Sequence, residues 1–290
     1  DATNVVDSRV QVITPIARDH EAWLGSTLER IAAEKAGIIR SRAVIGRQRP
    51  EAAAVVEAAL LDAGAQGYWL GRDFEVVGRG VAVGGQVVRL RGLAGEYEEV
   101  LLPLFGEHQA DNAAVAVAAV ELLLADADRP LSPAPFLEGM ETAASPGRLE
   151  VVGNSPTVLV DASHNVAGAE ALVAAVEETF PIGLIGLVGV LEDKDAEGLL
   201  GVLEPVLRQV VVTRSASARA MAPEVLGEMA REVFGPDRVE VMERLDGALA
   251  RAVELAGMDT PDSPGALATG VLATGSVTVA AEVRILMGRP

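Results

Sequence analysis

The 290-residue sequence contains no cysteine, few histidines and lysines, and only 3% aromatic residues. The absence of cysteine excludes disulfides, thiolate metal sites and cysteine nucleophiles, and is compatible with a cytoplasmic protein. Because half of the residues are apolar but few are aromatic, the core must consist mainly of Ala, Val, Ile and Leu. No apolar run approaches the roughly 18 residues of a membrane span. We therefore expect a soluble globular protein with no membrane partner.

Positive charge is also scarce, and its distribution is uneven. The net charge of −18 argues against a general nucleic-acid partner, because phosphate neutralisation needs clustered Lys and Arg. Any anionic ligand must instead be bound by a few individually positioned Lys or Arg side chains. Arginine supplies 22 of the 24 cationic residues, and the two lysines are Lys35 and Lys194. The three histidines are His20, His108 and His164, and all lie among polar neighbours.

The first half of the chain predicts helices mixed with short strands. A buried strand is expected in residues 10–15, followed by a helix that begins at the Ser26/Glu29 capping box and ends at Gly37. A second helix is expected in residues 51–63. Short alternating segments within residues 74–104, with a Gly84-Gly85 turn, predict a small antiparallel sheet. A buried helix in residues 113–125 would follow, capped by Asp111 and Asn112.

The second half has a simpler pattern, in which apolar strands alternate with helices. This pattern is typical of βαβ units on a parallel sheet covered on both faces. We expect an α/β protein of two domains, residues 1–145 and 146–290, the second Rossmann-like. The expected strands are residues 157–161, 183–189, 209–213, 238–242 and 270–274, and the expected helices are residues 167–179, 196–207, 222–234, 246–256 and 276–287.

Polar clusters follow several of these strands, at the edge where open parallel sheets bind ligands. They are Asp161–Asn165, Glu192–Asp195, Thr213-Arg214 and Thr274–Ser276. Helix capping is the simpler interpretation of Thr213 and Ser276, whereas capping does not require the imidazole of His164. Arg148, in the turn between the domains, suits a phosphate or carboxylate, but an exposed linker arginine explains it equally well.

In the first half, Lys35 lies on the expected apolar face of its helix. Such a lysine extends its ammonium to water, pairs with an acid such as Glu34 or Asp19, or loses its charge. A neutral amine would react with carbon dioxide to give a carbamate, which could bind Mg²⁺ or Mn²⁺ together with His20. The cluster Gly106–Asn112 could recognise a purine edge, although capping of the following helix is the simpler interpretation.

The order and spacing of several motifs resemble those of folylpolyglutamate synthase, often bifunctional as dihydrofolate synthase, in the Mur ligase superfamily. They run along the whole chain: Asp1–Asn4, Thr14–Gly25, Glu34–Ile38, Gly46–Gln48 with Pro50, Gly106–Asn112, Ser145–Glu150, Asp161–Asn165, Asp193–Asp195 and Thr274–Ser276.

The resemblance implies an ATP-dependent ligase and a P-loop-type first domain. In that family, ATP phosphorylates the carboxylate of dihydropteroate or folate, and the amine of L-glutamate then displaces phosphate. It implies a Mg²⁺ ligand at His20, a carbamylated lysine at Lys35, ATP contacts at Asn112, Arg148 and Asp161, an active-site histidine at His164, and a pterin-facing loop at Asp1 and Ala2. We expect a monomer.

The sequence departs from the family pattern in several places. Ser163 and Val166 replace the usual Ala and Pro, which should be tolerated because neither side chain carries the chemistry. There is no G-x-x-G-K-[ST] P-loop, and the magnesium-binding glutamate expected ahead of Asp1 is missing, so we expect the printed chain by itself to be inactive. The alternatives are another Mur-type ligase of cell-wall precursors and a non-catalytic nucleotide-binding remnant. A redox Rossmann enzyme is less favoured, because no G-x-G-x-x-G follows a strand.

Overall fold

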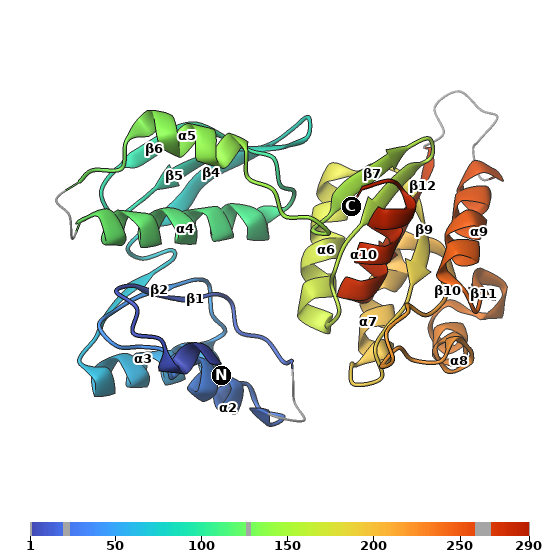
Figure 1. Cartoon of the computed structure of the whole chain (residues 1–290), viewed down its shortest axis with the longest axis horizontal. Helices are drawn as coiled ribbons and strands as arrows, with labels where there is room; N and C mark the ends of the chain where they lie inside the picture. The colour runs from blue at the N-terminus through green and yellow to red at the C-terminus, as the bar shows by residue number, and fades with distance from the viewer. Residues whose placement is uncertain (1, 20–23, 126–128, 259–267, 290) are drawn as a thin grey trace. The chain divides into compact units, whose positions relative to one another are not determined.

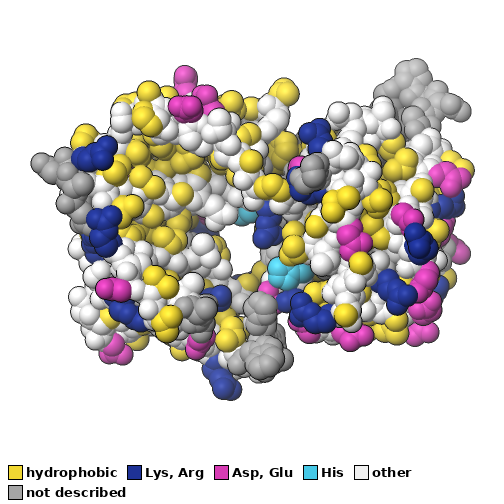
Figure 2. Space-filling model, viewed as in Figure 1, with side chains coloured by type: hydrophobic (Ala, Val, Ile, Leu, Met, Phe, Trp, Pro, Cys, Tyr) yellow, Lys and Arg dark blue, Asp and Glu magenta, His cyan; other side chains and the backbone are white. Residues whose placement is uncertain are grey.

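The structure is a computed structural model that describes residues 2–19, 24–125, 129–258 and 268–289. The chain divides into two compact units, Asp1–Ala144 and Ser145–Pro290, shown in Figure 1. Both units are of the α/β class, as the sequence predicts. None of the described helices is long and apolar enough to cross a membrane. On the face seen in Figure 2, basic side chains are scattered among acidic ones rather than gathered into a patch.

The first unit contains a three-stranded parallel sheet in the order β1-β2-β3. Ile13, Ala43 and Ile45 on these strands pack against buried residues of α2 and α3, such as Ile31 and Val56. The elements of this part are η1 (Ala2–Val5), β1 (Gln11–Ile13), α2 (Leu28–Ala36), β2 (Arg42–Ile45), α3 (Pro50–Ala63) and β3 (Gln66–Trp69).

A small antiparallel sheet completes the first unit, with strand order β4-β5-β6. It consists of β4 (Glu75–Ala82), β5 (Gly85–Arg91) and β6 (Glu96–Leu102), and is followed by α4 (Glu107–Ala125) and α5 (Pro133–Glu141). Figure 1 shows α4 running between this sheet and the strands β1 and β2. Val44 of β2 and Val88 of β5 belong to the same apolar cluster as α4 residues such as Ala114. Because both sides of α4 are covered, its sequence is apolar nearly all round.

The second unit is a six-stranded sheet in the order β11-β10-β9-β12-β8-β7, in which only β7 is antiparallel to its neighbour. The chain crosses the sheet in one direction as it passes from β8 through β9 and β10 to β11. The connection from β11 to β12 crosses back in the opposite direction. Right-handed crossovers therefore place α6, α7 and α8 on one face of the sheet and α9 on the other. Helix α10, which follows the last strand, lies on the α9 face, because its Val279 and Val283 belong to the same apolar cluster as Ala252 of α9. The elements are β7 (Glu150–Asn154), β8 (Thr157–Val160), α6 (Val166–Thr179), β9 (Gly183–Val188), α7 (Ala196–Leu203), η2 (Glu204–Val206), β10 (Leu207–Val212), α8 (Pro223–Phe234), η3 (Pro236–Arg238), β11 (Val239–Val241), α9 (Leu245–Met258), β12 (Thr269–Thr274) and α10 (Val277–Leu286).

Several sequence expectations are wrong in detail. Helix α2 is capped by Thr27 rather than Ser26, and α7 ends at Leu203 because the 3-10 helix η2 follows it. Asp111 and Asn112 are not caps, since α4 begins at Glu107 and both lie inside it. The short elements β2, β3, α5 and β7 were not expected, because brief or partly polar segments carry little periodicity.

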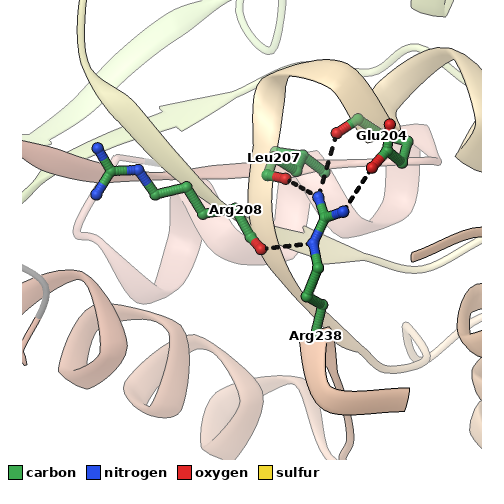
Figure 3. A network of polar contacts seen from close by, with 4 residues as sticks. All are labelled: Glu204, Leu207, Arg208 and Arg238. Atoms are coloured by element: carbon green, nitrogen blue, oxygen red, sulfur yellow. Dashed lines mark hydrogen bonds and ion pairs between the residues drawn. The ribbon is translucent and has the colours of Figure 1, made fainter. Parts of the chain in front are cut away.

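The amino-terminal ends of β10 and β11 are joined by Arg238 (Figure 3). Its guanidinium donates hydrogen bonds to the carbonyl oxygens of Arg208 and Leu207 and to the carboxylate of Glu204. It also lies 5.1 Å from the ring centroid of Phe234. These contacts fix the sheet at the end opposite to the carboxyl ends of its parallel strands, so Arg238 has a structural role.

A buried carboxylate organises the turn between β5 and β6 in the first unit. Glu121, 5% exposed, accepts hydrogen bonds from the backbone N–H groups of Leu93 and Ala94 and from the hydroxyl of Tyr97. Burial, together with the hydrogen bond to the Glu121 carboxylate, raises the pKa of the Tyr97 phenol well above its usual value. The neutral phenol is therefore favoured in the folded state.

We predict that this phenol makes stability fall at alkaline pH. A raised folded-state pKa gives a contribution that is complete below the unfolded pKa of about 10 and declines as the pH rises above it. Tyr97→Phe should cost about 1 kcal/mol at pH 7 and make the alkaline decline shallower. Urea unfolding of both proteins between about pH 7 and pH 11 measures this. An equally steep alkaline decline in the variant would contradict the prediction.

Candidate functional site

The turn that opens the second unit presents Arg148. The N–H of Arg148 donates a 3.1 Å hydrogen bond to the carbonyl of Ser145, which closes the turn. Gly147 and Leu149 on either side are buried, whereas Arg148 is exposed. Within the part of the chain that the structure describes, the Arg148 guanidinium has no hydrogen-bond or ion-pair partner. The turn therefore holds an unpaired cation at a fixed place in the backbone.

The carboxylate of Asp161 ties this turn to the end of β8. Its Oδ2 accepts a 2.8 Å hydrogen bond from the N–H of Leu149, and its Oδ1 accepts one of 2.7 Å from the N–H of Ser163. The Ser163 hydroxyl donates a further short hydrogen bond to Oδ1. Asp161 is only 5% exposed, so both of its oxygens are largely occupied by protein donors. Asp161 thus holds Arg148 in place through the backbone of the next residue.

The ends of the central strands are joined laterally, close to Asp161. The N–H of Asp161 donates to the carbonyl of Ala273, that of Gly275 to Ser163, and that of Gly189 to Thr274. Gly275 has a φ of +99°, and a β-carbon there would lie 2.9 Å from the carbonyl oxygen of Gly189. A glycine is therefore required for this close approach. Three strand ends, of β8, β9 and β12, thus form one continuous rim.

His164 lies on this rim, half-buried, after β8. Its Nδ1 is 2.9 Å from the carbonyl oxygen of Ala162, and because a carbonyl only accepts, Nδ1 carries a proton. The next residue, Asn165, caps α6 by accepting from the N–H of Gly168. Helix capping and the placing of an imidazole are thus done by different residues. Asn165 caps the helix, and His164 places its imidazole beside the cap.

In the first unit the structure brings two of the sequence motifs together. The amide of Asn4 donates a 3.1 Å hydrogen bond to the carbonyl of Glu34, one residue before Lys35 on α2. A β-carbon on Gly37 would lie 2.8 Å from that amide, so the contact depends on glycine. Lys35 is half-buried, at the edge of the buried face formed by Ile31, Ala32 and Ala36. Asn4 therefore lies against the end of the helix that carries Lys35.

Asn112 lies exposed on α4, with its amide donating to the Gln109 side chain at 3.3 Å. The preceding Asp111 is engaged by Arg47, whose Nε and Nη2 donate to its two oxygens at 3.0 and 3.3 Å. This hydrogen bonding raises the pKa of Arg47. Arg47 belongs to the Gly46–Gln48 motif, so that motif is fastened to the first turns of α4.

The remaining predicted site residues are Asp1, Ala2 and His20. Asp1 and His20 lie outside the described residues, and Ala2 begins η1. Among the residues that are described, no group of three or more His, Asp or Glu side chains could hold a metal ion. The predicted metal pair of His20 and Lys35 therefore stays a prediction.

A cavity of about 480 Å³ opens at the ends of β10 and β11. Arg214 and Arg244 line it, but they already pair with the carboxylates of Glu243 and Asp246. The lining also includes Glu282, so its acids outnumber these two arginines. The cavity is thus poorly suited to a phosphate, in contrast to Arg148, which has no partner among the described residues.

Comparison with known proteins identifies the family of the chain. Residues 147–276 match the family model of the Mur ligase glutamate ligase domain. The dihydrofolate synthase/folylpolyglutamate synthase of Mycobacterium tuberculosis is 45% identical over 304 residues, covering 100% of this chain and 62% of the relative. The chain belongs to the folylpolyglutamate synthase family of Mur ligases. It also matches the folylpolyglutamate synthase of Lacticaseibacillus casei, 30% identical over 98% of this chain and 63% of the relative.

Solved structures of the folylpolyglutamate synthase family have the same fold. The M. tuberculosis folylpolyglutamate synthase complexed with ADP superposes with a TM-score of 0.94 at 44% identity, covering 100% of this chain and 66% of that one. An FPGS-AMPPCP-folate complex superposes with a TM-score of 0.82 at 28% identity, covering 99% of this chain and 63% of that one. The chain thus spans somewhat less than two thirds of the length of these relatives.

Three contributions to this folylpolyglutamate synthase-like site escaped the sequence reasoning. Ser163 was expected to be neutral, yet its hydroxyl binds Asp161. Glu150 and Arg284 form an ion pair next to the Arg148 turn. Glu150 could have been suspected from its place in the Ser145–Glu150 motif, whereas nothing in the sequence singles out Arg284.

We predict that Ser163→Ala destabilises the protein by about 1 to 2 kcal/mol, because a hydroxyl bonded to a buried carboxylate is lost. The midpoint of urea unfolding should fall with an unchanged m-value. Ser217→Ala is the control, since that hydroxyl accepts only one long hydrogen bond, of 3.3 Å, in an exposed loop. Equal midpoints for the Ser163 and Ser217 variants would contradict the prediction.

Proposed function

We propose that the protein to which this chain belongs is an ATP-dependent ligase that joins L-glutamate to the carboxylate of dihydropteroate, a folate, or both. The observation that carries the proposal is the guanidinium of Arg148, which has no partner in the described part of the chain and is held in a fixed turn beside the rim of strand ends. It is supported by 45% identity to a dihydrofolate synthase/folylpolyglutamate synthase over the whole chain. The related structures complexed with ADP, or with AMPPCP and folate, support the nucleotide and the folate substrate.

The proposed reaction has two steps. A carboxylate oxygen of the pteroate or folate attacks the γ-phosphorus of ATP, which breaks the bond to ADP and forms an acyl phosphate. The glutamate amine then attacks the acyl carbon, phosphate leaves, and the nitrogen loses a proton as the amide forms. Such phosphoryl transfer depends on positioning and on neutralisation of charge. In so acidic a chain, only a few cationic groups can neutralise the phosphate charge.

Each proposed residue has a distinct task. Arg148 binds phosphate with its planar guanidinium. Asp161 fixes the turn of Arg148 and, with Asn112, contacts the nucleotide. His164 helps to place the nucleotide or the incoming glutamate. Asp1 and Ala2 face the pterin. We further propose that the protein is monomeric and cytoplasmic.

Divalent metal, Mg²⁺ or Mn²⁺, belongs to the proposal through His20 and a carbamylated Lys35. The residues that the structure describes do not by themselves form a metal site, so no step is assigned to the metal. When bound, it would neutralise phosphate charge.

We predict that Arg148→Gln lowers affinity for ADP and ATP by about 10-fold to 100-fold, because a charge-assisted phosphate contact is lost. Binding is measured by calorimetry on the protein in its natural full length, and activity by phosphate release and mass of the glutamylated product. Arg231→Gln, which removes an exposed arginine on α8, is the matched control and should bind normally.

The same assay tests the proposed function as a whole. ATP-dependent addition of glutamate to dihydropteroate or to a reduced folate supports it. Failure with both substrates contradicts it, and binding of a UDP-muramoyl peptide but of no pterin would favour a cell-wall ligase.

We predict that Lys35 is carbamylated in the full-length protein with ATP and Mg²⁺ bound. A half-buried amine that becomes neutral can react with carbon dioxide, and the product carries a negative charge in place of a positive one. A crystal structure of that complex should show carbamate density beyond Nζ. Density that ends at an unmodified ammonium, with both ligands present, would contradict this prediction.

A further inference from the structure

A carboxylate and a guanidinium with no assigned role hold the turn that carries Arg148. Glu150 on β7 accepts two hydrogen bonds at one oxygen, Oε2: from the N–H of Gly147 at 2.8 Å and from Nε of Arg284 on α10 at 2.7 Å. The side chains of Arg284 and Glu150 are only 18% and 26% exposed. Water therefore screens this pair less than it screens an ordinary surface ion pair.

The backbone on both sides of Arg148 is fixed by protein groups. The N–H of Gly147 is bound by Glu150, and its carbonyl accepts a 2.8 Å hydrogen bond from the N–H of Ala162. On the other side, the N–H of Leu149 donates to Asp161. The Arg148 side chain, in contrast, is exposed and has no partner among the described residues. The network thus fixes the backbone from which the Arg148 side chain extends, and leaves the N–H donors of its guanidinium available.

The turn has a conformation that needs such support. Gly147 has a φ of +73° and the buried Leu149 has a φ of +43°. The left-handed region is unfavourable for a residue as bulky as leucine, so the chain would relax if its anchors were lost. Without Arg284, the ionised Glu150 would gain hydration by turning toward water, and it would then release Gly147. Loss of Arg284 would in this way displace Arg148.

We propose that Glu150 and Arg284 are positioning residues for nucleotide binding. Neither touches the ligand: Arg284 fixes the Glu150 carboxylate, Glu150 fixes Gly147, and the turn presents Arg148 to the phosphate. This inference rests on the proposed function, because Arg148 must bind the nucleotide for its position to matter.

The test is a double-mutant cycle of ADP affinity, measured by calorimetry on the protein in its natural full length. Arg148→Gln should raise the Kd for ADP about 10-fold or more, and Arg284→Gln about 3-fold to 10-fold. The double variant should bind no more weakly than Arg148→Gln alone, because Arg284 acts only through Arg148. A purely structural role would change thermal stability without this coupling.

The matched control is Arg251→Gln. Arg251 on α9 makes a two-pronged pair with Glu240 on β11, with both contacts at 2.8 Å, at the opposite edge of the same sheet. Its loss should lower stability but leave the Kd for ADP unchanged. Arg284→Lys retains the charge and should recover part of the affinity. If Arg284→Gln does not fold, Arg284→Lys and Glu150→Gln take its place in the cycle, with smaller effects in the same direction.

Two results overturn the positioning proposal alone: an unchanged Kd in the Arg284 variant while Arg148→Gln weakens binding, or effects that multiply in the double variant. If Arg148→Gln itself binds ADP as tightly as the parent, the nucleotide role of Arg148 in the proposed function fails, and the positioning proposal is overturned with it.

Discussion

The arrangement of the second unit depends on the buried carboxylate of Asp161. One of its oxygens holds the loop that follows β8, through Ser163, and the other holds the turn before β7, through Leu149. A buried carboxylate is stable only when its oxygens are matched by donors, and here backbone N–H groups and a hydroxyl supply them. The same interaction therefore satisfies Asp161, fixes His164 beside the rim, and fixes the backbone next to Arg148.

A second constraint is electrostatic. In a chain with a net charge of −18, an anionic substrate cannot be held by a broad basic surface. Arginines such as Arg238 and Arg251 are occupied by acids or carbonyl groups. Arg148 differs because its neighbours are bound through their backbone, which leaves its guanidinium available. Because few positive charges are available, a single arginine such as Arg148 can have a specific role in binding an anion.

The sequence predicted the second unit more accurately than the first. Near-continuous apolar strands such as Gly183–Val188 and Thr269–Thr274 have few competing interpretations, and they formed the expected parallel sheet. In the first unit, β3 contains Gln66 and Gly67 and is too short for a periodic signal. Asp111 and Asn112 have side chains typical of caps, but α4 extends past them because Arg47 pairs with Asp111 and so satisfies its carboxylate inside the helix.

The sequence by itself determined the α/β class, the resemblance to folylpolyglutamate synthases, and the residues Arg148, Asp161 and His164 as candidates for one site. These conclusions rest on residue types and local spacing, which are present in the chain before it folds. Only the tertiary structure decided how the candidates are supported. Arg284 reaches Glu150 across 134 residues of sequence, and a contact of that range leaves no local pattern, because it exists only when α10 packs beside β7 and β8.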